Sequence, residues 1–87
     1  MTDELTLMHG NVTVIAQTAD DMTTDRLEYI ARQIAAYAAG FRPYAEVQTL
    51  LDLMQIRGDW EPDALVPAWT GYDYDRQTWL TVYVHAA

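Results

Sequence analysis

The sequence predicts an α+β fold in which two helices pack on one face of an antiparallel sheet. Apolar and polar residues alternate near both ends of the chain, as in half-buried strands, and the middle carries two apolar stripes with helical spacing. Gly and Pro residues separate these segments. With 87 residues the chain is long enough for one modest core. We therefore expect a single compact domain over residues 1–87, with its elements in the order ββααββ.

The first element predicted is a β-hairpin over residues 4–16. Leucine and valine alternate with threonine on both sides of the segment 9–11. That segment reads His-Gly-Asn, and Gly and Asn tolerate the positive φ that a tight turn requires. Both strands should bury one face.

The first helix is expected to begin near Thr24 or Asp25. Asp25 and Glu28 are spaced as in a capping box, and both carboxylates suit the positive end of the helix dipole. Gly40 is placed to end the helix as a C-terminal cap.

The second helix should cover residues 43–56. Pro43 suits a first helical turn, and Gly58 is expected to end the helix. The two helices form an αα-hairpin, and residues 57–68, which contain three Gly or Pro residues, are expected to be an irregular connection.

A second hairpin is predicted at the C-terminal end, pairing residues 68–73 with 77–85. The turn falls within 72–76, and the last strand alternates strictly between two faces. Its outer face would carry Trp79, Thr81, Tyr83 and His85. The core expected from all these patterns is Leu27, Ile30, Ile34, Val47, Leu50, Leu51, Met54, Leu80, Val82 and Val84.

Charge excludes several classes of partner. Five Arg and no Lys stand against thirteen Asp and Glu, for a formal net charge of −8. Binding to DNA, RNA or anionic membranes requires clustered cations, so we expect neither direct nucleic-acid binding nor membrane association. No apolar run approaches the length of a membrane span, and the first residues lack the basic start of a signal peptide. We expect a cytoplasmic protein, in the host cytoplasm if a phage encodes it.

The residue inventory also argues against catalysis. The chain has no Cys, Ser or Lys, and its four glycines are isolated. Most nucleophiles and every phosphate-binding glycine loop are therefore missing. His9 and His85 are too few for a zinc site without converging carboxylates. We expect no enzyme, no metal and no cofactor.

Acidic and aromatic residues occur together in two predicted loops. Aromatic anchors beside carboxylates are typical of protein interfaces with basic partners. The alternatives are that the acids only keep the protein soluble, and that Trp60 and one tyrosine complete the core. A third acidic group, near the start of the first helix, is accounted for by capping. The predicted partner-binding residues are Asp59, Trp60, Glu61, Asp63, Tyr72, Asp73, Tyr74 and Asp75.

In length, charge and acid–aromatic loops the chain is similar to the small acidic proteins with which phages and mobile elements inhibit host defence, including anti-CRISPR proteins and DNA mimics. The resemblance covers no alignable stretch, so it assigns no residue a role. It implies a non-catalytic inhibitor that docks on a basic, nucleic-acid-handling protein. One alternative is a small homo-oligomeric structural or assembly protein of a phage or bacterium, which would bury the Trp79/Tyr83 face between copies. Another is a small-ligand binder or enzyme with an aromatic pocket.

Overall fold

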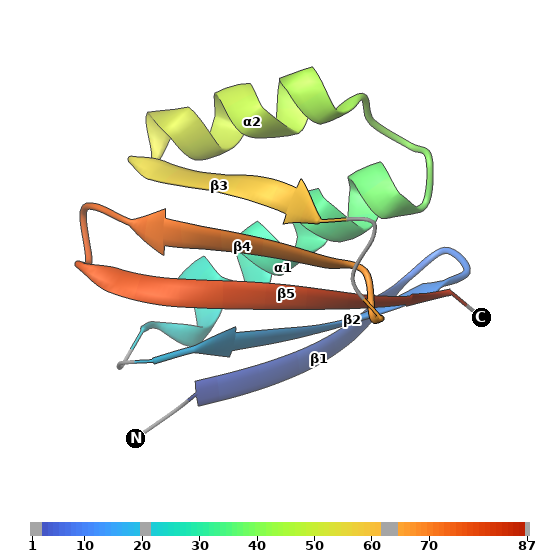
Figure 1. Ribbon diagram of the computed structural model, residues 1–87, viewed down its shortest axis with the longest axis horizontal. Helices are drawn as coiled ribbons and strands as arrows, with labels where there is room; N and C mark the ends of the chain where they lie inside the picture. Colours follow the sequence, from blue (N-terminus) through green and yellow to red (C-terminus); the bar gives the residue numbers. More distant parts are fainter. Residues whose placement is uncertain (1–2, 20–21, 62–64, 87) are drawn as a thin grey trace.

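The computed structural model describes residues 3–19, 22–61 and 65–86, which form a five-stranded antiparallel sheet and two helices (Figure 1). In chain order the elements are β1 (Asp3–His9), β2 (Val12–Thr18), α1 (Thr24–Ala38), α2 (Tyr44–Leu53), β3 (Ile56–Glu61), β4 (Ala68–Asp73) and β5 (Thr78–Ala86). The strands lie in the order β1-β2-β5-β4-β3. Because β5 pairs with β2, the two terminal hairpins share one sheet, and the predicted α+β fold is confirmed.

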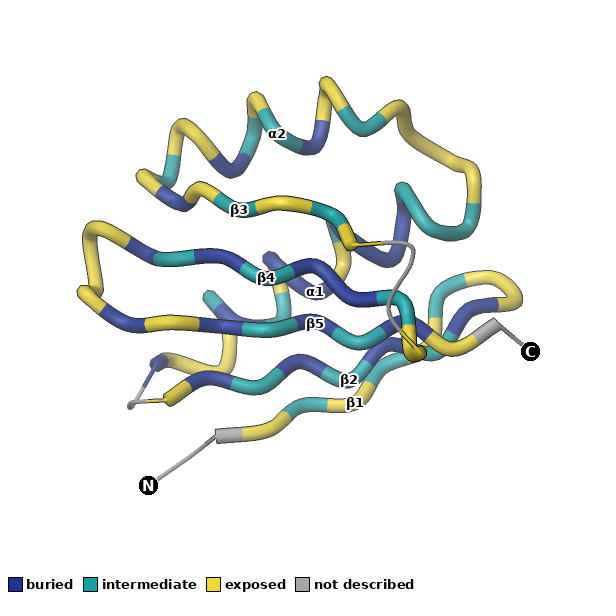
Figure 2. Tube along the Cα trace, viewed as in Figure 1, coloured by how far each residue is buried: buried dark blue, intermediate teal, exposed yellow. Residues whose placement is uncertain are grey.

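The core lies between the sheet and the helices. α1 contacts β1, β2 and β5, and α2 contacts β3 and α1. Figure 2 shows the resulting alternation along β2, where every second residue is buried. Leu50 and Met54 are half-buried, contrary to prediction. The other predicted core residues are buried: Leu27, Ile30, Ile34, Val47, Leu51, Leu80, Val82 and Val84.

Helix α1 begins where the sequence predicts, but with a different cap. The hydroxyl of Thr23 accepts a hydrogen bond from the backbone N–H of Arg26 at 3.3 Å. Thr23 is therefore the N-cap residue, and Asp25 lies exposed in the first turn.

Strand β3 is the main departure from the predicted order. The sequence predicts a helix as far as residue 56 and an irregular connection after it, whereas α2 ends at Leu53 and a strand begins at Ile56. Gln55 adopts a positive φ of 62°, which reverses the chain within one residue of the helix cap at Met54. The order is therefore ββααβββ.

Gly58 is a strand residue and not a helix cap. It lies opposite Gly71 of β4, and a Cβ at either glycine would collide with the Trp69 ring. The two glycines thus leave space for a large buried indole across the strand pair. Within the described residues, neither helix has the length and apolarity needed to cross a membrane.

Candidate functional site

The sheet has a second face, opposite the core, which we call the open face. It is formed by the alternate side chains of the strands that do not point toward the core. The core residues of α1 and α2 pack on the other side of the sheet. In Figure 1, α1 lies behind the sheet and α2 lies beside β3, so the face toward the viewer carries neither helix.

Three aromatic side chains meet at one end of the open face; we call them the aromatic cluster: Tyr72, Tyr74 and Trp79. Tyr72 lies opposite Trp79 in the β4–β5 register, and their ring centroids are 4.9 Å apart in an edge-to-face arrangement. The rings of Tyr72 and Tyr74 are 4.8 Å apart in the same manner. Trp79 remains 61% exposed and Tyr74 58% exposed. A large apolar area therefore faces solvent, held by mutual ring contacts.

Carboxylates without an ion pair share this face with the aromatic cluster. The N···O distances from the five arginines of the chain to their nearest carboxylates lie between 2.6 and 3.8 Å. The described residues provide no such partner for Glu4, Asp59 or Glu61, all of which are exposed. By register these three residues belong to the open face, with Glu4 on edge strand β1 and the other two on edge strand β3. The open face is thus acidic at both edges.

A shallow groove of about 630 Å³ connects these features. Its walls come from α2, β3, β4 and β5, and they include Asp59 and Asp52 together with the whole aromatic cluster. Arg57 also lines the groove, and its guanidinium lies 3.8 Å from the Asp52 carboxylate. A ligand in this groove would meet aromatic rings and carboxylates at once.

The structure brings some of the predicted partner-binding residues together and separates others. Asp59, Glu61 and Tyr72 lie on the open face, and Tyr74 joins them from the adjoining turn. Trp60 faces the opposite way, half-buried, with its ring 5.5 Å from that of Tyr37. Asp75 is exposed in the β4–β5 turn. Asp63 lies outside the described residues.

The prediction that Asp73 binds a partner is wrong, because Asp73 is buried and does not lie at an exposed hairpin tip. Its carboxylate accepts hydrogen bonds from the Arg26 guanidinium and from the backbone N–H groups of Asp75 and Arg76. Strand alternation explains this position, since Asp73 follows Trp69 and Gly71 on the core side of β4. It cannot contact a partner without leaving the core.

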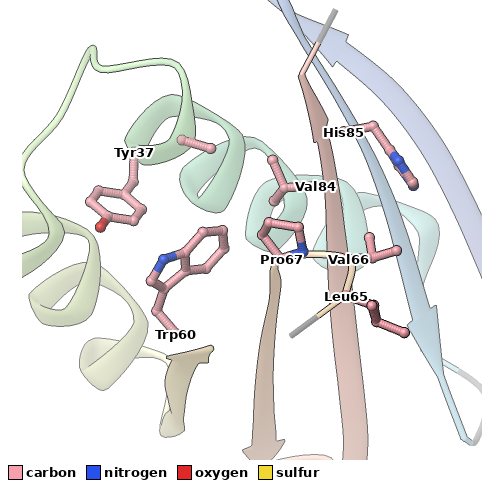
Figure 3. Close-up of a pocket in the computed structure, with 8 residues that line it drawn as sticks. Tyr37, Trp60, Leu65, Val66, Pro67, Val84 and His85 are labelled. Carbon is pink, nitrogen blue, oxygen red and sulfur yellow. The ribbon is translucent and has the colours of Figure 1, made fainter. Parts of the chain in front are cut away.

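Trp60 lines a separate pocket of about 500 Å³ at the other end of the molecule (Figure 3). Tyr37 of α1, Leu65 and Val66 of the loop before β4, and His85 of β5 contribute to it. The side chain of Leu65 is fully exposed beside the opening. Among the described residues the lining is mainly apolar and includes no carboxylate.

A partly buried hydrogen-bond network links the helix and strands that line the groove. The Trp69 indole N–H donates to the Tyr44 hydroxyl at 3.0 Å, and that hydroxyl lies 3.5 Å from the Gly58 carbonyl oxygen. Burial raises the pKa of Tyr44, opposed by the hydrogen bond from Trp69 and assisted by the negative charge of Asp59. α2 is thereby fixed against β3 and β4.

Neither histidine belongs to a metal-type cluster within the described part of the chain, where no three His, Cys, Asp or Glu side chains converge. The imidazole of His9 packs edge-to-face on Phe41, with ring centroids 5.2 Å apart.

The partner-binding residues predicted from the sequence did not include Trp79, which entered only the alternative of a homo-oligomer, although strand alternation places it on the outer face of the last strand. Sequence reasoning also missed the lining contributed by α2, because the proximity of α2 to β4 is a tertiary feature. No protein-family model, curated protein or solved structure matches this chain.

Proposed function

We propose that this protein is a small acidic, non-catalytic binding protein that inhibits a basic, nucleic-acid-handling protein by docking its open face on that partner. One observation carries the proposal: carboxylates without an ion pair share the open face with an exposed aromatic cluster. Within the described residues each arginine lies beside another carboxylate, so Glu4, Asp59 and Glu61 are left for the cations of a partner.

The aromatic cluster adds apolar contact area, which a charged surface alone does not provide. Tyr and Trp are enriched among the residues that dominate binding energy, since they bury a large area with few rotatable bonds. Exclusion of water by Trp79 and Tyr74 would place nearby ion pairs in a lower dielectric, where they are stronger.

The inhibitory part of the proposal follows from the sign of the charge. This chain, with a net charge of −8, and a nucleic acid are both strongly negative. Both would therefore bind the same basic surface of the partner and compete for it. Binding of one would then exclude the other.

The test is affinity capture from cells that carry the gene, with two variants of equal charge. The first combines Glu4→Gln, Asp59→Asn and Glu61→Gln on the open face. The control combines Asp25→Asn, Glu28→Gln and Glu46→Gln, all on the helices. We expect the wild type and the control to retain one basic nucleic-acid-binding protein that the open-face variant loses.

The purified wild type should then reduce the partner's binding to its nucleic acid, and more strongly at low salt than at high salt. Equal capture by both variants would contradict the proposal. So would a captured partner whose nucleic-acid binding is unchanged by saturating amounts of this protein.

A second candidate function, self-association into a homo-oligomer, draws on the same exposure of Trp79. Its salt dependence should be opposite, because joining two open faces brings carboxylates of the same sign together. Light scattering across a salt series distinguishes the two: a mass that rises with salt, and falls again in Trp79→Ala, favours self-association.

A further inference from the structure

We propose that the groove beside the aromatic cluster takes an arginine side chain of the partner, with its guanidinium paired to Asp59 and stacked on the aromatic rings. This inference rests on the proposed function and specifies the chemistry of its central contact. It follows from what lines the groove, from the charge that the chain leaves uncompensated there, and from the geometry of the rings.

The charge of the residues that line the groove favours a positively charged ligand. Asp52 and Asp59 line the groove, and the one positive side chain among its lining residues, Arg57, lies 3.8 Å from Asp52. Asp59 has no ion pair within the described residues. The groove therefore keeps a net negative charge, and a partner cation at Asp59 would neutralise it.

The aromatic rings favour a flat cation. The planar guanidinium of Arg stacks on aromatic faces and forms several hydrogen bonds in its own plane, whereas the ammonium of Lys is compact and strongly hydrated. The groove offers ring surface from Tyr72 and Trp79 and hydrogen-bond acceptors from Asp59 and Thr70. Both kinds of contact suit Arg better than Lys.

Tyr72 contacts both other rings of the cluster directly: its ring centroid lies 4.8 Å from that of Tyr74 and 4.9 Å from that of Trp79. No ligand fits between Tyr72 and either neighbour, so a guanidinium would stack on the ring surfaces that face the groove.

Exposed aromatic rings on a sheet also suit the stacking of nucleic-acid bases. Here the phosphates of a strand would meet Glu4, Asp59 and Glu61 on the same face, with Arg57 already beside Asp52. Charge therefore favours the arginine, and a single-stranded oligonucleotide becomes a competing ligand in the experiment.

The experiment is an NMR titration that follows the three indole N–H signals, with the Trp79 signal assigned from Trp79→Phe. The probes are the capped peptide Gly-Arg-Gly-Arg-Gly, its Lys counterpart and a short oligothymidine. The Trp60 indole N–H, assigned from Trp60→Phe, serves as internal control, because Trp60 lines the separate pocket and not the groove. We expect the Arg peptide to shift the Trp79 signal, to leave the Trp60 signal in place and to bind roughly two- to fivefold more tightly than the Lys peptide.

Asp59→Asn should weaken binding of the Arg peptide by a similar factor, as measured from the Trp79 signal. Trp79→Ala should do the same when binding is followed by the backbone amide signals of Thr70 and Tyr72 in the groove. Glu28→Gln, which removes the same charge from the exposed side of α1, should not weaken it. Equal affinity for the two peptides, tighter binding of oligothymidine, or equal loss in Asp59→Asn and Glu28→Gln would overturn the inference. If any of these occurs while the open-face variant still loses the captured partner, the proposed function survives without the arginine contact.

Discussion

The guanidinium of Arg26 and the carboxylate of Asp73 form a bidentate ion pair that joins three distant parts of the chain. Arg26 Nε donates to Asp73 Oδ2 at 2.7 Å, and Arg26 Nη2 donates to Oδ1 at 3.1 Å. The same Nη2 donates to the Met54 carbonyl oxygen at 3.0 Å. The pair thus fixes the start of α1 and the end of α2 to the β4–β5 turn that carries Tyr74, so it also positions one end of the aromatic cluster.

Asp73→Asn should destabilise the protein by about 3–5 kcal/mol, since it leaves the guanidinium of Arg26 in a largely dry site without its counter-charge. The side chains of Arg26 and Asp73 are only 14% and 0% exposed. The measurement is the free energy of unfolding of the wild type and of Asp73→Asn, from urea denaturation. Asp75→Asn is the control, because Asp75 is 48% exposed and lies 3.7 Å from Arg26; it should cost less than about 1 kcal/mol. Equal losses would show that the buried pair has no special role.

Leu51→Ala should cost about 2–5 kcal/mol, whereas Leu50→Ala should cost clearly less. Leu51 is fully buried in the core and Leu50 is half-buried, although both follow the same helical stripe in the sequence. Thermal and chemical denaturation of the two variants provide the comparison. A larger loss in Leu50→Ala would contradict the orientation of α2 described above.

Gly71→Ala should destabilise the protein by about 1–3 kcal/mol or more, because the new methyl group would lie 2.7 Å from Trp69 Cζ3 and the indole has no space to retreat. Gly40→Ala is the matched control: φ at Gly40 is +84°, but no atom lies within 4 Å of the added Cβ. Both should lose stability, but only Gly71→Ala should change the near-ultraviolet circular dichroism spectrum, because it displaces the buried Trp69 indole that contributes to it. An unchanged spectrum in Gly71→Ala would contradict the packing of the indole on the two glycines.

Tyr44 should make the protein lose stability at alkaline pH. Burial raises the pKa of Tyr44 above its ordinary value of 10.0, so the folded state keeps its proton where the unfolded state releases it. This contribution is complete below pH 10 and falls as the pH rises from 10 through the raised pKa. The measurement is the free energy of unfolding at pH 8, 10 and 11.

Tyr44→Phe should lose stability at pH 8, because Trp69 loses its hydrogen-bond acceptor, but it should lose less than the wild type between pH 10 and 11. Parallel curves for the two proteins would mean that Tyr44 does not titrate with folding.

Local patterns in the sequence determined most of the secondary structure. The alternation in residues 4–16 and 77–85 predicted strands, and the apolar stripe from Leu27 to Ala38 predicted α1, because each pattern repeats within one element and needs no distant partner. The composition also determined the acidic character that the proposed function uses.

The tertiary structure decided what those patterns could not encode. Residues 56–61 include a glycine and both polar and apolar residues. They form a strand because they pair with the edge of β4, where the Trp69 ring fills the space left by the missing side chain of Gly58. Asp73 looks like a turn residue until Arg26, 47 positions earlier, is folded against it.

The candidate site follows the same division. Sequence alone grouped Trp60 with Asp59 as neighbours, but successive residues of a strand point to opposite faces, so Trp60 lies on the core side and Asp59 on the open face. Trp79 reaches the groove that Asp59 lines because β5 pairs with β4 and β4 with β3. Local periodicity specifies which side chains share a face of one element, whereas strand order and register, set by long-range packing, specify which elements bring their faces together.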